Sequence, residues 1–80
     1  MAKLNVKINS AMKNLYDGVA DIVVMKTIDG ELGVMANHIP MATILNAPVK
    51  IKNDAQEIFI DIKNAIAKVS DNTLSIINFD

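Results

Sequence analysis

Short runs of alternating apolar and polar residues, each followed by turn-forming residues, constrain the fold of this chain more than any other feature. Leu4, Val6 and Ile8 alternate with polar residues, and residues 73–76 repeat the pattern. A period of two places the apolar side chains on one face of a β-strand. Turn signals recur roughly every eight to twelve residues, a spacing typical of a β-sandwich or barrel. The pattern therefore favours an all-β fold.

The same reading predicts where individual strands and turns lie. Residues 14–18 carry the polar and glycine residues of a turn, and residues 19–28 are rich in the β-branched side chains of a strand. A short strand is expected at 32–35 and another at 49–52. Pro40 cannot donate a ladder hydrogen bond, so it is expected at a strand start or edge.

One segment leaves helix and strand open. Asp54 followed by Glu57 resembles a helix capping box, with aspartate in place of the usual serine or threonine. The apolar residues that fall at helical spacing are Ile58, Ile62, Ala65, Ile66 and Val69. The isoleucines of this segment also satisfy period two, and its sequence is β-prone. The structural alternative is therefore an α+β fold with a helix near residues 55–69.

Length and composition indicate one small globular domain that covers residues 1–80. The chain is 51% hydrophobic and 21% charged, and it contains no cysteine, which excludes a disulfide scaffold or a thiolate metal site. A domain of this size buries only about 60% of its unfolded surface, so a partner would add useful area. Neither a secretory leader nor a membrane-spanning run is visible, so the cytosol is the default location.

The charge pattern argues against nucleic acid as a partner. The net charge is −1, arginine is absent, and eight lysines are balanced by nine carboxylates. Phosphate recognition normally uses clustered basic residues, arginine above all. Only three aromatic residues are present to stack on bases.

Three sequence blocks together carry a family resemblance. The most specific is residues 30–40, in which Gly30, Glu31 and Gly33 precede a His-x-Pro corner; residues 16–18 and 57–60 match further family segments. The chain resembles, from Val6 to about residue 77, the amino-terminal domain of the epsilon subunit of the F-type ATP synthase.

The resemblance implies a flattened sandwich of two mostly antiparallel sheets with about ten short strands. It assigns residues 57–69 to strands. It also implies a non-catalytic rotor subunit of the central stalk, which joins the gamma subunit to the membrane c-ring and supports the coupling of ion transport to ATP synthesis or hydrolysis. Such a subunit lies at the cytoplasmic face of the cell membrane, is held there by its partners, and needs no catalytic residue, cofactor or metal.

The resemblance assigns Ser10, His38 and Thr43 to the interface with gamma. From the residues alone, the favoured interpretation of His38 is a hydrogen-bonded side chain that fixes the loop before Pro40, which is compatible with a place at the interface. Metal binding is the weakest interpretation, because a lone histidine beside Glu31 and Asp29 lacks convergent ligands.

The resemblance assigns Glu31 to the c-ring interface. From the residues alone, Glu31 is interpreted as a solvated acid in a turn. Gly30 and Gly33 are expected to serve loop geometry, as is Pro40. The spacing of the two glycines is no phosphate loop, because the lysine and hydroxyl residue of that motif are missing.

Two family turns are altered, at residues 46–48 and 63–65, so the strand boundaries there are the least certain. The carboxy-terminal helical hairpin of the family, which binds ATP in some members, is not expected in this chain, and neither is ATP binding. The rival function is a small free α+β domain that binds a ligand or catalyses a reaction through His38 and nearby carboxylates.

Overall fold

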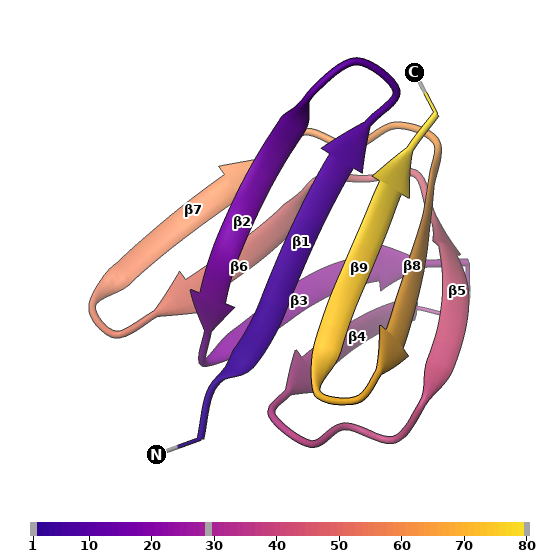
Figure 1. Cartoon of the computed structure of the whole chain (residues 1–80). Helices are drawn as coiled ribbons and strands as arrows, with labels where there is room; N and C mark the ends of the chain where they lie inside the picture. Colours follow the sequence, from indigo (N-terminus) through magenta and orange to yellow (C-terminus); the bar gives the residue numbers. More distant parts are fainter. Residues whose placement is uncertain (1, 29, 80) are drawn as a thin grey trace.

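The computed structural model describes residues 2–28 and 30–79, and these residues form strands, turns and loops without a helix (Figure 1). No helix long and apolar enough to cross a bilayer occurs in them. The strands among the described residues are β1 (Leu4–Ser10), β2 (Asn14–Ala20), β3 (Ile22–Thr27), β4 (Gly30–Met35), β5 (Met41–Leu45), β6 (Val49–Asn53), β7 (Gln56–Ile60), β8 (Ala65–Ser70) and β9 (Thr73–Asn78).

The strands form two layers that are joined at one side. One layer has the order β2-β1-β9-β8-β5, and the other contains β4, β3, β6 and β7, with β3 between β4 and β6. Every neighbouring pair is antiparallel except β1 and β9, which run parallel. Among the described residues, a single ladder pair, Thr27 with Leu45, links the layers through β3 and β5. In Figure 1 the first layer lies in front of the second.

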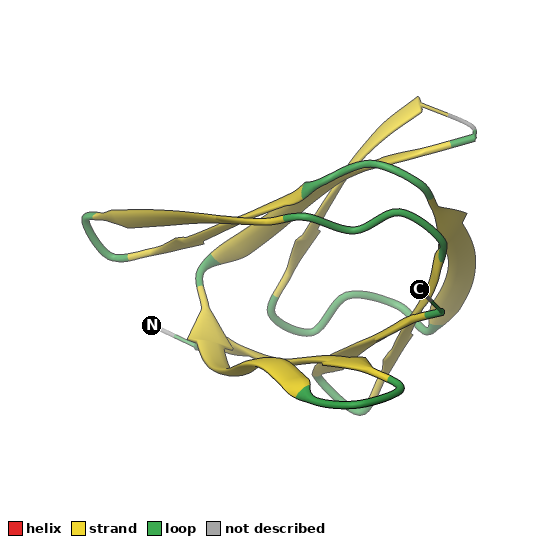
Figure 2. Ribbon diagram, turned by 90° about the horizontal axis from the view of Figure 1, so that it is seen from above, coloured by secondary structure: helices red, strands yellow, loops and turns green. Residues whose placement is uncertain are grey.

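The core fills the space between the two layers. Sixteen apolar residues of the described chain are buried there, and they come from both layers. On β1 these are Leu4, Val6 and Ile8, whose alternation predicted the strand correctly. Figure 2 shows the layers from above, with the β6–β7 hairpin of the second layer projecting beyond the first layer. Residues on that hairpin's outer strand are therefore mostly exposed.

The sandwich prediction is confirmed, with nine strands in the described residues where about ten were expected. The alternative helix near 55–69 is wrong, because β7 and β8 occupy that segment. β7 pairs with β6 along its whole length, and β8 lies between β5 and β9. The cross-strand hydrogen bonds and the burial of Ala65, Ala67 and Val69 outweigh the helical spacing of the apolar residues.

The turn predicted at residues 14–18 is also wrong, since these residues lie in β2 and the chain reverses at 11–13. Gly18 suits a strand here because the Tyr16 side chain, on the same core-facing side of β2, occupies the space beside it. A Cβ at Gly18 would lie 3.3 Å from the Tyr16 hydroxyl oxygen. That hydroxyl donates to the carbonyl of Val19 at 3.1 Å. The strand predicted for 19–28 is interrupted at Asp21, between β2 and β3.

Candidate functional site

His38 lies in the connection between β4 and β5, just before Pro40 and the first residue of β5. Its backbone N–H donates to the carbonyl of Met35 at 3.3 Å, and its Nδ1 donates to the carbonyl of Ile39 at 2.8 Å. The side chain is half-buried. The histidine is thus hydrogen-bonded within its own corner, and Pro40 directly precedes β5.

Asn72 ties this corner to the rest of the first layer. It occupies the β8–β9 turn beside Asp71, and both residues have positive φ, 56° and 52°. Asparagine and aspartate tolerate this left-handed conformation better than most residues. The Asn72 side chain accepts from the N–H of Asn37 and donates to the carbonyl of Lys3, each at 2.8 Å. No sequence signal predicted these two long-range bonds of Asn72.

Glu31 lies in strand β4 and not in the loop predicted for it. It is exposed, and it pairs in the ladder with Lys26 of β3. Gly30 begins β4 with φ 115°, a conformation that favours glycine. Gly33 lies within the strand, where a Cβ would come 3.2 Å from Ile22 Cδ1. Gly33 therefore leaves room for a neighbouring side chain, and the predicted Asp29 turn lies outside the described residues.

A cavity of about 260 Å³ separates β4 from β5, because these two strands are not paired. It brings together Gly30, Glu31 and Thr43, three residues predicted from the sequence to serve the interfaces or the loop. Thr43 is half-buried and points to the same side of β5 as the buried Leu45. Glu31 and Thr43 therefore border one cleft, although the resemblance assigns them to different partners.

Ser10 lies apart from His38. It ends β1 at the edge of the β1–β2 connection, where its Oγ bonds to the backbone of Lys13 at 3.3 Å. It pairs with Asn78 at the far end of β9, whereas the His38 corner is tied to Asn72 at the start of β9. Ser10 and His38 are therefore at opposite ends of the strands of the first layer.

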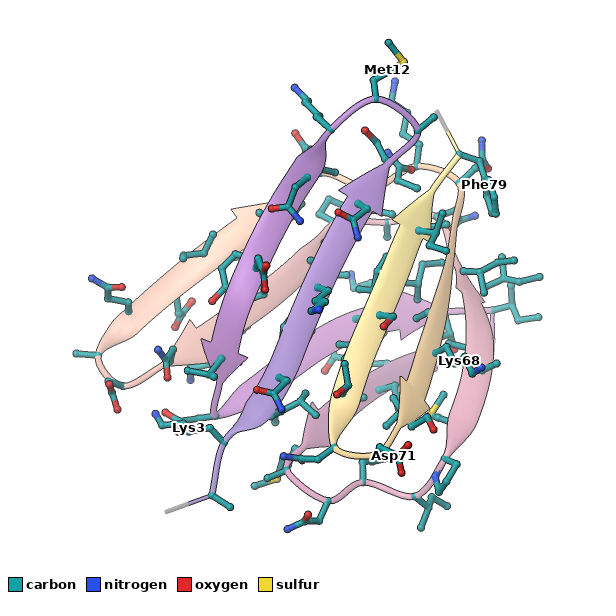
Figure 3. The ribbon with its side chains drawn as sticks, in the orientation of Figure 1. Lys3, Met12, Lys68, Asp71 and Phe79 are labelled. Carbon is teal, nitrogen blue, oxygen red and sulfur yellow. The ribbon has the colours of Figure 1, made fainter. Side chains whose placement is uncertain are left out.

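The structure also shows an exposed apolar surface that the sequence analysis missed. Ile44 of β5 pairs with Ile66 of β8, which pairs with Ile77 of β9, and all three side chains point away from the core. Their exposed fractions are 57%, 43% and 51%. We call these three residues the isoleucine row. Figure 3 shows Phe79, itself 61% exposed, beyond the end of β9 and Lys68 further along β8.

An ion cluster joins the chain start to the second layer. Lys3 Nζ lies 2.7 Å from Asp21 Oδ1 and 2.9 Å from Asp54 Oδ1. The hydrogen bond from Lys3, and then one from the Asp54 backbone, lower the pKa of the Asp21 carboxyl. Bonds to Asp21 and Asp54 raise the pKa of Lys3. The described residues contain no group of three or more histidine, cysteine or carboxylate side chains suited to a metal ion.

A comparison with known protein families identifies the family of this chain. The family model of the ATP synthase delta/epsilon chain beta-sandwich domain matches residues 3–78. The chain belongs to this family. The two-layered fold is thus that of a delta/epsilon-type β-sandwich domain.

Curated relatives of the delta/epsilon-type domain include epsilon chains of different lengths. The ATP synthase epsilon chain of Caulobacter vibrioides is 33% identical over 78 residues, which cover 96% of this chain and 91% of the relative. The epsilon chain of Brevibacillus brevis is 34% identical over 68 residues, covering 84% of this chain and 49% of the relative. The chain therefore spans about half the length of the Brevibacillus protein.

Solved structures share the fold. A chain of the mitochondrial ATP synthase of Euglena gracilis superposes with a TM-score of 0.90 at 17% identity, covering all of this chain and 52% of that one. A chain from the central stalk and c-ring of the Tetrahymena thermophila enzyme gives a TM-score of 0.78 at 20% identity, covering 99% of this chain and 65% of that one. At these identities the likeness concerns the architecture of the delta/epsilon-type domain.

Proposed function

We propose that this protein is a non-catalytic subunit of the central stalk of an F-type ATP synthase. It joins the gamma subunit to the membrane c-ring and helps couple ion translocation to ATP synthesis or hydrolysis. Its family membership supports this role, as do the named assemblies of its structural neighbours. Within the complex it lies at the cytoplasmic face of the membrane and is peripheral to it.

The isoleucine row is the observation that carries this proposal. Three half-exposed isoleucines side by side on one sheet face are costly in water, and contiguous exposed apolar groups mark interaction surfaces. Gamma is the partner proposed for this row and for Ser10, His38 and Thr43. Glu31, on the other layer, is proposed to face the c-ring.

The rival function, a free α+β ligand-binding or enzymatic domain, loses its structural basis. The helix near 55–69 on which it depended is replaced by β7 and β8. His38 bonds to backbone carbonyls of its own corner and forms no ion pair with a carboxylate of the described residues. A contact role therefore accounts for the geometry better than catalysis.

Co-purification from native membranes tests the proposal. A tagged unmutated chain is expected to recover gamma and c subunits from solubilised membranes. Ile66→Lys places a charge in the middle of the isoleucine row and should reduce gamma recovery at least tenfold. Val19→Lys is the matched control, because Val19 is a 40% exposed residue of β2 in the same layer but outside the row.

Two further variants address the residues predicted from the sequence. Glu31→Ala should lower ring recovery while gamma is retained, and His38→Ala should lower gamma recovery. If the unmutated chain recovers neither subunit from membranes that contain assembled synthase, the proposed function is wrong. If Ile66→Lys and Val19→Lys behave alike, the row is not the gamma surface.

A further inference from the structure

A shallow groove lies on the outer face of the second layer, on different strands from the isoleucine row. Its volume is about 340 Å³. It is bordered by residues of β3, β4, β6 and β7 and by the connection before β6. The lining residues used below are Val24, Lys26, Glu31, Pro48, Lys50 and Phe59.

The strand register explains why a groove forms here. Gly33, Val24, Lys50 and Phe59 are successive ladder partners across β4, β3, β6 and β7, so they share one face. Gly33 contributes no side chain to that row, and Val24 is half-buried. Phe59 is 66% exposed at the outer end of the row. The surface at Gly33 and Val24 is therefore recessed, and the exposed ring of Phe59 projects at the other end of the row.

The charges of the groove are not balanced within the described chain. The ion pairs among the described residues involve Lys3 and Lys52, and no described carboxylate lies within 4.0 Å of the ammonium of Lys26 or Lys50. Lys50 is half-buried beside Phe59. Glu31 is the one carboxylate among the residues that line the groove. A cation on a partly apolar surface gains most from a carboxylate that also excludes water.

From this arrangement we infer that the groove receives an acidic, partly apolar segment of the subunit that Glu31 faces. A carboxylate of that segment bonds to Lys50 or Lys26, and an adjacent apolar side chain covers Val24 and Phe59. The inference rests on the proposed function, in which the Glu31 side meets the c-ring. It adds that this contact is directed by two lysines as well as by one glutamate.

Glu31 links the groove to the side of the domain that is proposed to meet the c-ring. It borders the 340 Å³ groove and also the 260 Å³ cleft between β4 and β5. Lys26 is the ladder partner of Glu31, so a segment that reaches Glu31 also lies next to Lys26. These charges, with Glu31 and Lys26 at one end of the groove and Lys50 further along it, would fix the orientation of the bound segment more than they raise its affinity.

Zero-length cross-linking in native membranes tests the contact directly. A water-soluble carbodiimide joins a lysine amine to a carboxylate as an amide, and the carbodiimide takes up the elements of water to become a urea. Membranes carrying the tagged chain are treated, and cross-linked peptides are identified by mass spectrometry. We expect an amide between Lys50 or Lys26 and an aspartate or glutamate of the c subunit.

Charge reversal supplies the second measurement. Lys50→Glu should reduce c-subunit recovery at least tenfold while gamma recovery is unchanged, which also shows that the variant is folded. Phe59→Ala should reduce it several-fold. Lys63→Glu is the control, because Lys63 is exposed in the connection between β7 and β8 and does not line the groove.

The outcomes separate this inference from the proposed function. If gamma and c subunits are recovered but neither lysine forms a cross-link, the groove inference is wrong and the stalk role stands. Cross-links that lead to gamma or to a phospholipid headgroup also overturn it. If neither subunit is recovered with the unmutated chain, the proposed function fails and takes the inference with it.

Discussion

Ile76 and Ile77 are neighbours on β9, yet they belong to different regions of the molecule. Ile76 is fully buried between the layers, while Ile77 is 51% exposed in the isoleucine row. The pleat of the strand sends successive side chains to opposite faces, so identical residues enter different environments. Burying an isoleucine contributes about 1.5–3 kcal/mol. The buried Ile76 contributes this free energy to folding. The exposed Ile77 contributes only part of it to folding, and the rest is gained when a partner covers the side chain.

The inner face should suffer most from truncation. Ile76→Ala removes buried methyl groups and leaves a cavity between the layers, so the free energy of unfolding should fall by about 2–5 kcal/mol. Chemical denaturation followed by circular dichroism measures the change. Ile76→Val is the graded control, with an expected loss of about 0.5–1.5 kcal/mol. A loss below about 1 kcal/mol for the alanine variant would show that the core is less closely filled than the burial of Ile76 indicates.

The turn end of the same layer depends on polar bonds, and Asn72→Ala should break it. The change removes both side-chain hydrogen bonds, to Asn37 and to Lys3. It also places alanine at φ 56°, a left-handed conformation that alanine adopts less readily than asparagine. We expect a loss of about 1–3 kcal/mol in unfolding free energy and faster hydrogen exchange at the Asn37 amide.

Asn72→Gly divides that effect between its two causes. Glycine accepts the positive φ at no steric cost, but it cannot make the side-chain bonds. It should therefore lie between the unmutated protein and the alanine variant in stability, with the Asn37 amide exchanging as fast as in Asn72→Ala. Equal stability of the two variants would mean that the backbone conformation contributes nothing.

The sequence predicts the strands whose two faces differ in polarity. β1 is the clearest case, because Leu4, Val6 and Ile8 are separated by asparagine and lysine, and the pleat converts that order directly into one buried face. β8 is harder to predict, since Ala65 and Ala67 face inward while the larger Ile66 faces out. Residues 65–67 are apolar on both faces, so this part of the strand gives no local signal for which side is buried.

The site residues depend on topology, which local patterns do not contain. The corner before Pro40 is predictable, because proline and positive-φ asparagine are local signals. The separation of Ser10 from His38 follows from the direction of β1 and from the tie between Asn37 and Asn72, which are 35 positions apart. The isoleucine row needs the register of three strands, and the groove needs that of four. These contacts are set by long-range pairing.

The ion cluster of Lys3 and Asp21 joins the two layers from outside, so its contribution should depend on pH. The folded-state pKa of Asp21 is lowered, so its stabilisation is present above the unfolded pKa and is lost as pH falls through the folded value. The folded-state pKa of Lys3 is raised, so its stabilisation is lost only as strongly alkaline pH passes that value. The contribution should therefore hold at neutral pH and be lost progressively as pH falls below about 4.

Asp21→Asn measures this contribution, because the amide oxygen can still accept from the Asp54 backbone. The denaturation midpoint of the variant should lie below that of the unmutated protein at pH 7, and the two should converge towards pH 3. Asp17→Asn is the control, since Asp17 is exposed and forms no ion pair with the described residues. A gap between Asp21→Asn and the unmutated protein that stays constant with pH would contradict an ionic origin.

The smallest effect on stability is expected where the proposed effect on function is large. Ile77→Thr keeps a β-branched residue on β9 and removes apolar surface from the outer face, so the free energy of unfolding should stay within about 0.5 kcal/mol. Gamma recovery should nevertheless fall several-fold, because one end of the apolar row becomes polar. Ile76→Val is the converse, with a larger loss of stability and unchanged gamma recovery. If Ile77→Thr destabilises the domain more than Ile76→Val does, the outer isoleucine serves the fold, and the division between the two faces of β9 does not hold.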